Sequence, residues 1–314
     1  MMQRVPSRLS SAIDDRLEGK SDPGGVEMVS INIGETPRSY LVHLPARYTR
    51  TRRWPVVVMF HGGGGTAKVA MEDTGWARKG EQAGFISVFP EGTRPNPARP
   101  ARFIGNAQSW NDGSHMPAKS AGERGVDDMA FVSALLKDIE RRYSINQRRI
   151  YATGFSNGAS MSFRLARELS TRIAAIAPVA GHDCIDQEPT RAVPVIYLVG
   201  KADPLSPFDG GEVFIGKKPF GMKPPTMTML RKWATIHDLP AEHRVTFEKC
   251  GAQGVAFGSV IPPMVVVYTF DGHGHHWPGG KTLLPIRLAG ENKTSQSATD
   301  IIWNFFKTHR LPAE

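Results

Sequence analysis

The sequence predicts an α/β fold in which helices cover both faces of one mostly parallel sheet. Runs rich in β-branched residues alternate with segments of helical periodicity. One run, WPVVVMF (54–60), is apolar throughout, as in strands buried on both faces. The chain has 314 residues, 40% of them hydrophobic, which is enough for one large core. We therefore expect one domain over 27–314, after an N-terminal extension over 1–26 that we expect to be poorly ordered.

Each expected element follows from its own pattern. Strands are expected where apolar, β-branched runs end at turn residues, at 38–45, 54–60, 85–90, 149–153, 173–180, 193–200 and 264–270. Helices are expected where apolar residues recur on one helical face, over 127–143, 159–169 and 299–309. This alternation of strands and helices is typical of a parallel sheet.

Two long stretches, 94–125 and 204–225, fit neither pattern and are expected to be loops. Loops of this length in a compact domain usually border a functional site or are disordered. By contrast, only residues 181–191 separate two of the strands, which leaves no room for a helical cap. We therefore expect an open site with no cap domain.

Charge and composition exclude some classes of protein. The net charge of +9 is spread over short runs, and no basic element carries the interleaved aromatic residues of a nucleic-acid binder. No apolar stretch is long enough for a signal peptide at the start or for a membrane span, so we expect no membrane association and favour the cytoplasm. Cys184 and Cys250 allow at most one disulfide, and their pairing stays open.

The segment GFSNG (154–158) matches the pattern G-x-S-x-G and lies between an expected strand and an expected helix. A sharp turn there would lift the Ser156 hydroxyl clear of the sheet, with glycines keeping side chains out of the bend. The amides of the following helix would point at a developing anion. A tight turn that happens to contain serine would also match the pattern, but this context favours a nucleophile.

A serine nucleophile needs a histidine base and a carboxylate that orients the histidine. Asp203 follows the strand 193–200 at the edge where catalytic side chains of open α/β sheets gather. It could instead form an Asx-turn before a proline, and Asp209 is the second candidate for the acid. The segment GHGHHWPGG (272–280) follows the last strand and offers three histidines in a pliable, glycine-rich loop.

The glycines of HGGGG (61–65) end a strand at the same sheet edge. The Gly63 amide can pair with the Asn157 amide to form an oxyanion hole, although four glycines could also be only a flexible turn. Candidate substrate-binding residues beside these motifs are His61, Trp110 and Trp277. The two tryptophans could equally belong to the core, and the acidic pair Asp127 and Asp128 is expected to cap a helix.

Taken together, RSYLVHLP, HGGGG, SWNDG, VDD, YATGFSNGASM, APVAG, GKADPLSPFDGG and GHGHHWPGG resemble the polyhydroxybutyrate depolymerase-type esterases. That group of lidless α/β-hydrolases is related to feruloyl and acetylxylan esterases, and the resemblance covers the chain from about residue 30. It implies a single-domain α/β-hydrolase with Ser156 as nucleophile and Asp203 as acid. The family motif, approximately G-x-G-H-x-W-P-G, places the base on His275, with His276 in the variable position. Many relatives carry a secretion signal, so secretion is the alternative location.

These residues predict hydrolysis of carboxylic esters through an acyl-Ser156 intermediate, without a metal or organic cofactor. The expected substrates are small or oligomeric esters with short-chain, hydroxyacyl or aromatic acyl groups, such as hydroxybutyrate oligomers or feruloyl esters. A serine peptidase or an inactive hydrolase-fold binding protein are the alternatives. A binuclear metal site would use H-x-H-x-D-H, and HGHHWP lacks the aspartate and the last histidine of that pattern. The oligomeric state stays open.

Overall fold

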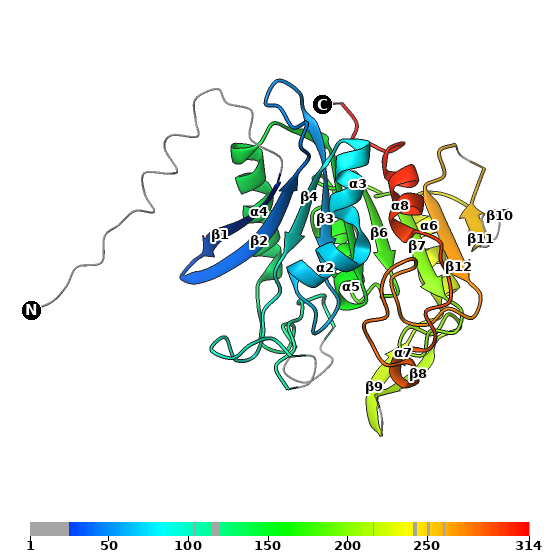
Figure 1. Cartoon of the computed structure of the whole chain (residues 1–314). Coiled ribbons are helices and arrows are strands. Elements are labelled where there is room, and N and C mark those ends of the chain that lie inside the picture. Colours follow the sequence, from blue (N-terminus) through cyan, green and yellow to red (C-terminus); the bar gives the residue numbers. More distant parts are fainter. Residues whose placement is uncertain are drawn as a thin grey trace, which may run out of the picture.

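The structure is a computed structural model that describes residues 25–102, 105–114, 120–215, 217–240, 244–249, 252–259 and 261–313. Its centre is a sheet of ten strands in the order β1-β2-β4-β3-β5-β6-β7-β12-β11-β10 (Figure 1). The strands of this sheet are β1 (Gly25–Ile33), β2 (Thr36–Leu44), β3 (Trp54–Phe60), β4 (Ile86–Pro90), β5 (Ile145–Phe155), β6 (Ala175–Val179), β7 (Val195–Gly200), β10 (Arg244–Lys249), β11 (Ala252–Phe257) and β12 (Val265–Phe270).

The middle of the sheet is parallel, and both of its edges are antiparallel. Strands β4, β3, β5, β6, β7 and β12 pair in parallel, whereas β1 and β2 at one edge and β11 and β10 at the other are antiparallel. Every residue of β3, β4, β6 and β7 is buried. This burial explains why these segments are continuous apolar runs, and the predicted mostly parallel sheet is confirmed.

Helices cover both faces of the sheet. Helices α4 (Asp128–Arg142), α5 (Asn157–Glu168) and α6 (Thr226–Ile236) contribute to one core cluster, and α2 (Ala67–Thr74), α3 (Trp76–Ala83) and α8 (Ala298–Phe306) contribute to a second cluster on the opposite face (Figure 1). A short helix, α7 (Ile286–Ala289), lies in the chain between β12 and α8. The prediction of an α/β-hydrolase fold with helices on both faces is thus confirmed.

The 204–225 stretch, predicted to be an irregular loop, forms a hairpin of its own. Strands β8 (Gly211–Ile215) and β9 (Lys218–Lys223) pair antiparallel, separately from the main sheet, and project below it in Figure 1. Each of these short strands contains a glycine, and most of their described side chains are at least partly exposed, so no buried apolar run predicts them. The prediction for 204–225 was therefore wrong in secondary structure.

The parallel arrangement brings the predicted functional segments to one sheet edge. The HGGGG loop follows β3, GFSNG follows β5, the Asp203 segment follows β7 and the histidine loop follows β12. All of these strands run in the same direction, so their carboxyl ends meet at that edge. The residues between β6 and β7, all of them described, form no helix, as predicted for an uncapped edge. No helix in the described ranges is long and apolar enough to cross a bilayer.

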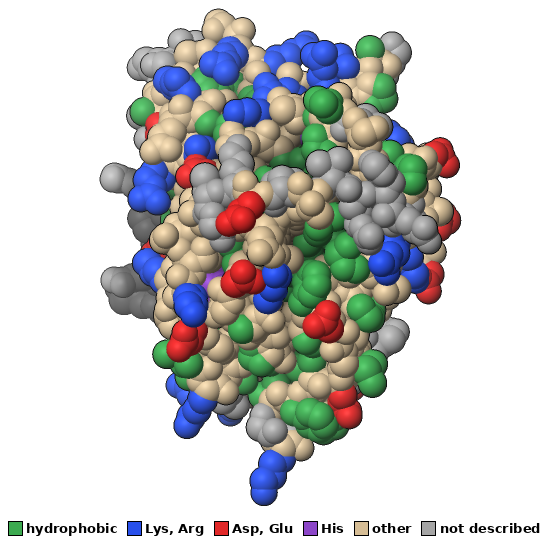
Figure 2. Space-filling model, turned by 90° about the vertical axis from the view of Figure 1, so that its right-hand side faces the viewer, with side chains coloured by type: hydrophobic (Ala, Val, Ile, Leu, Met, Phe, Trp, Pro, Cys, Tyr) green, Lys and Arg blue, Asp and Glu red, His purple; other side chains and the backbone are tan. Residues whose placement is uncertain are grey.

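The side of the molecule that carries β10 to β12 is hollowed, as Figure 2 shows. This hollow has a volume of about 450 Å³ and is lined by apolar side chains, among them Phe208, Met227 and Val255, with Lys201 and Glu248 also on its wall. It contains none of the predicted catalytic residues. The site described below is therefore distinct from it.

Candidate active site

Ser156 lies in a strained turn between β5 and α5. Its backbone φ is 54° and ψ is −121°, a conformation that costs a residue other than glycine about 1 to 3 kcal/mol. The turn is tight: a Cβ atom on Gly154 would lie 2.2 Å from the carbonyl oxygen of Gly158, and one on Gly158 would lie 2.2 Å from that of Phe60. Glycine is required at both positions, as the sequence predicts, and the turn holds Ser156 at the sheet edge.

The structure brings Ser156, His275 and Asp203 into one hydrogen-bonded chain. The Ser156 hydroxyl lies 2.9 Å from Nε2 of His275, and Nδ1 of His275 lies 2.8 Å from Oδ2 of Asp203. Asp203 and His275 are each 3% exposed. The second candidate for the acid, Asp209, is exposed in the loop beyond.

Backbone amides hold the Asp203 carboxylate in place. Its Oδ1 atom accepts hydrogen bonds from the amides of Leu205 at 2.8 Å and Ser206 at 2.7 Å, which leaves Oδ2 for His275. Burial raises the pKa of Asp203, but the adjacent His275 and these hydrogen bonds outweigh it and lower the pKa below its ordinary value. An ionised Asp203 accepts a hydrogen bond from the Nδ1–H group of His275. Nε2 of His275 is therefore left unprotonated and can accept the Ser156 proton.

The other two histidines of the loop have structural partners instead. Nδ1 of His273 accepts hydrogen bonds from the amides of Lys293 and Thr294, and its Nε2 donates to the carbonyl of His276. His276 donates from Nε2 to the carbonyl of Gly290 at 3.0 Å. Among the described residues, no group of three or more His, Cys, Asp and Glu side chains is arranged to hold a metal ion.

Two amides beside Ser156 are arranged to receive an anion. In the glycine loop, the amides of Gly64 and Gly65 donate to the carbonyls of Gln108 and Gly62, whereas that of Gly63 has no partner within the described part of the chain. Asn157 is the first residue of α5, where a backbone amide has no intrahelical acceptor. The two residues are neighbours, since a Cβ atom on Gly63 would lie 3.9 Å from that of Asn157.

The Asn157 side chain connects the nucleophile turn to the 94–125 loop. Its Oδ1 atom accepts the Trp110 amide at 2.7 Å, and its Nδ2 atom donates to the Trp110 carbonyl and to Asp112 Oδ2, at 3.1 and 2.7 Å. This pairing fixes the SWNDG segment directly over the turn. The role of SWNDG is therefore to position the first residue of α5.

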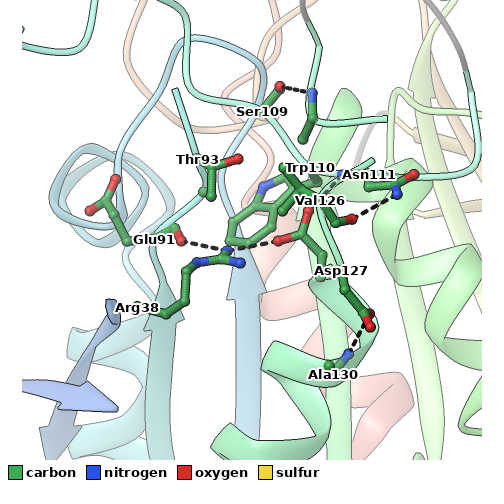
Figure 3. Close-up of polar contacts among 12 residues, drawn as sticks. Arg38, Glu91, Thr93, Ser109, Trp110, Asn111, Val126, Asp127 and Ala130 are labelled. Carbon is green, nitrogen blue, oxygen red and sulfur yellow. Dashed lines mark hydrogen bonds and ion pairs between the residues drawn. The ribbon is translucent and has the colours of Figure 1, made fainter. Parts of the chain in front are cut away.

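A buried ion pair anchors the same loop to the sheet and to α4 (Figure 3). Asp127 caps α4 by accepting the Ala130 amide at 2.8 Å, which confirms the capping prediction for this residue. Asp128 is fully buried and instead pairs with Arg38 at 2.7 Å while accepting the Asn111 amide at 2.7 Å. This second role was not predicted from the sequence, although two acidic residues at one helix start suggest that one is not needed as a cap.

The prediction that Trp110 and His61 contact substrate was wrong. Trp110 is completely buried, donates from its indole nitrogen to the His61 carbonyl at 2.9 Å and packs edge-on against Phe60. His61 is 2% exposed; its Nδ1 donates to the Gly62 carbonyl and its Nε2 accepts the Gly92 amide. Burial lowers the pKa of His61 to about 4, so the ring stays neutral. Both side chains therefore support the glycine loop by donating hydrogen bonds to its backbone carbonyls.

The prediction for Trp277 was wrong for the same reason. This residue is 2% exposed, belongs to the core cluster on the α8 side of the sheet and donates from its indole nitrogen to Thr299 Oγ1. A ring packed in the core has no face for a substrate. Proximity in sequence to the histidines gave no information about the direction of the side chain.

Replacement of Trp277 by alanine should therefore affect stability and not substrate choice. Removing a buried tryptophan is expected to lower the free energy of unfolding by about 3 to 5 kcal/mol, measured by urea denaturation with Trp277→Phe as the milder control. KM for methyl ferulate and for p-nitrophenyl acetate should change by the same factor in folded protein. A selective rise in KM for the aromatic ester at unchanged stability would contradict this assignment.

Fold and site together define the class of protein. A strained serine between a strand and a helix, bonded through a histidine to a carboxylate beyond a later strand, is the arrangement of an α/β-hydrolase. Residues 48–215 match the phospholipase/carboxylesterase family. The chain belongs to this family and is a carboxylic ester hydrolase.

Individual relatives agree with this assignment. The chain is 26% identical to NocK of Nocardia uniformis subsp. tsuyamanensis, which is named as an esterase, over 85% of this chain and 78% of NocK. It is 26% identical to feruloyl esterase B of Piromyces equi, over 78% of this chain but 44% of that protein. The structure resembles that of an acetyl xylan esterase from Aspergillus awamori with a TM-score of 0.61, 14% identity and coverage of 90% and 99% of the two chains. At this identity the last likeness concerns the fold alone.

Proposed function

We propose that Ser156, His275 and Asp203 are the catalytic residues of a serine esterase. The observation that carries the proposal is the hydrogen-bonded chain from the Ser156 hydroxyl through His275 to Asp203. As Ser156 Oγ attacks the ester carbonyl carbon, its proton passes to Nε2 of His275, and Asp203 stabilises the resulting imidazolium. Nε2 then gives the proton to the leaving alkoxide, and an acyl-serine ester remains.

The acyl-serine is resolved by the same groups in a second half-reaction. Water loses a proton to Nε2 of His275 and attacks the acyl carbonyl, and the proton then returns to Ser156 Oγ as the acid leaves. In both steps negative charge develops on the carbonyl oxygen. The amides of Gly63 and Asn157 are the donors that we assign to it, because they are adjacent to each other and lack other acceptors among the described residues.

For substrates, we propose esters with short-chain, hydroxyacyl or hydroxycinnamoyl acyl groups. Feruloyl esterase B is named for an aromatic ester, and the uncapped sheet edge favours compact acyl groups. A lid would be needed to bury a long acyl chain. Cleavage of hydroxybutyrate oligomers stays a prediction.

Acetyl and butyryl p-nitrophenyl esters should be hydrolysed at least roughly tenfold faster than the palmitoyl ester, because the open edge does not enclose distal methylenes. Purified enzyme would be assayed on this series together with methyl ferulate, acetylated xylan and hydroxybutyrate oligomers. No increase in rate is expected at a lipid interface. A preference for palmitate would contradict the uncapped site, and hydrolysis of peptides but not esters would favour a serine peptidase.

A fluorophosphonate probe separates an active enzyme from an inactive binding protein of the same fold. The probe should modify Ser156 in the wild type, and peptide mass spectrometry would locate the adduct. Failure to react, together with absent turnover across the ester panel, would contradict the proposed function.

A further inference from the structure

His182 lies between the segments that carry the nucleophile and the acid. Strand β6 is placed between β5 and β7 in the sheet, and it ends at Val179, three residues before His182. Ser156 follows β5 and Asp203 follows β7. The residues after β6 therefore reach the carboxyl edge of the sheet in the gap between these two.

The backbone on the N-terminal side of His182 is fixed against the nucleophile turn. Ala180 has a φ of 54°, and a Cβ atom on Gly181 would lie 2.5 Å from the carbonyl oxygen of Ser156. The His182 amide donates to Ser160 Oγ at 3.0 Å, one turn into α5. These contacts place His182 in a defined position relative to Ser156.

The next residue, Asp183, anchors the other side of His182. Its carboxylate accepts two hydrogen bonds at Oδ2 from Arg167, at 3.0 and 2.7 Å, and one from the Trp233 indole at 3.0 Å. Both charged side chains are buried, with exposures of 2% and 5%. A residue held on both sides by buried contacts can present its ring in one orientation.

The His182 ring has no hydrogen-bond partner, although it is buried. The residue is 6% exposed, and neither Nδ1 nor Nε2 bonds to any residue of the described chain. In His273, by contrast, both ring nitrogens are bonded. Buried polar groups are nearly always paired, so both nitrogens of the His182 ring are available to bond to a bound molecule.

The electrostatic environment of the buried His182 ring includes two residues of the proposed catalytic chain. Burial lowers its pKa to about 3, with further electrostatic effects from Lys223 at the end of β9, from Asp203 and from His275. The imidazole is therefore neutral at physiological pH. A neutral imidazole offers one N–H donor and one acceptor nitrogen, which complements a hydroxyl group.

We propose that His182 is a specificity-determining residue that binds a hydroxyl group of the ester substrate. The inference rests on the proposed esterase function and narrows its substrate class to hydroxylated esters. The hydroxyl can belong to the acyl part or to the alcohol part, since both flank the carbonyl carbon at Ser156. Loss of this partner should affect hydroxylated esters selectively, because the unpaired hydroxyl would be left buried.

The test compares matched esters that differ by one hydroxyl group. Methyl 3-hydroxybutyrate against methyl butyrate, and methyl 4-hydroxycinnamate against methyl cinnamate, test the acyl part, and 2-hydroxyethyl butyrate against propyl butyrate tests the alcohol part. In at least one pair the wild type should prefer the hydroxylated ester by about tenfold or more in kcat/KM. His182→Phe should remove this preference while changing the other ester of the pair by less than about threefold, and His182→Gln should restore part of it.

A buried histidine elsewhere serves as the control. His309 is 5% exposed and its Nε2 is also without a partner in the described chain, but it follows α8 at the C-terminal end. His309→Phe should leave every preference unchanged. A wild type with no preference in any pair would overturn the inference, and this result does not depend on whether His182→Phe folds. Equal losses of kcat/KM on both members of each pair in folded His182→Phe would also overturn it. A wild type that cleaves none of the esters would contradict the proposed function itself, and therefore also the inference that rests on it.

Discussion

Ser156→Ala should reduce kcat for ester hydrolysis on the order of 10⁶-fold while the fold is retained. The hydroxyl is the only atom group removed, and it is the one that lies 2.9 Å from Nε2 of His275. Initial rates on p-nitrophenyl acetate would be compared with the far-UV circular dichroism spectrum and the Tm. Ser162→Ala is the matched control, because Ser162 is a buried serine of α5, the helix that follows Ser156, and its hydroxyl donates to the Gly158 carbonyl. Activity of Ser156→Ala within tenfold of the wild type would exclude Ser156 as the nucleophile.

A double variant tests whether the serine and the histidine act as one unit. Once Ser156 is absent, a base at His275 has no proton to accept, so His275→Ala and the double variant should show about the same residual rate as Ser156→Ala. His273→Ala and His276→Ala should retain measurable activity in folded protein, since their rings bond to the backbone. Losses that multiply in the double variant would mean that His275 contributes to the reaction independently of the serine.

The sequence predicts the centre of the sheet better than its edges for a physical reason. Strands such as β3 and β7 are buried on both faces, so apolar residues fill every position. The edge strand β1 is largely exposed, and polar residues interrupt its pattern. Strands β1, β10 and β11 were not predicted from the sequence, because their conformation depends on pairing with a neighbouring strand.

The residues of the site also fall into two groups, those that could be placed from the sequence and those that could not. Ser156, Asp203 and His275 could be placed together because each follows a strand, and parallel strands end at one edge. The direction of Trp110 and Trp277 could not be predicted, because large aromatic residues next to a motif suit a pocket wall and a core equally well. Both tryptophans are buried in the structure, so they belong to the core.

His182 shows what is visible only in three dimensions. In the sequence it is one histidine in a short crossover between two strands. Its distinguishing property is that its ring is buried without a hydrogen-bond partner among the described residues. This property can be recognised only when the positions of the neighbouring residues are known. The contacts of Asn157 with Trp110 and Asp112 likewise join segments more than forty residues apart in the chain.

Asp203→Asn should lower kcat by about 10³- to 10⁴-fold, because the amide would select the wrong histidine tautomer. The amides of Leu205 and Ser206 both donate to Oδ1 of Asp203, so the asparagine must keep its carbonyl oxygen at that position. Its NH₂ group would then occupy the position of Oδ2 and donate a hydrogen bond to Nδ1 of His275. With Nδ1 as acceptor, the ring proton moves to Nε2, which can no longer accept the Ser156 proton.

The matched control for this change is Asp209→Asn, since Asp209 is exposed and lies six residues further along the same loop. It should leave kcat within about twofold, as is usual for a surface substitution away from the site. Both variants would be assayed on p-nitrophenyl acetate, with KM determined separately from kcat. Because Asp203 acts through His275 and not on the ester, Asp203→Asn should change kcat far more than KM. Equal activity of the two variants, or a greater loss in Asp209→Asn, would remove Asp203 from the proposed catalytic chain and place the acid elsewhere in the 204–225 segment.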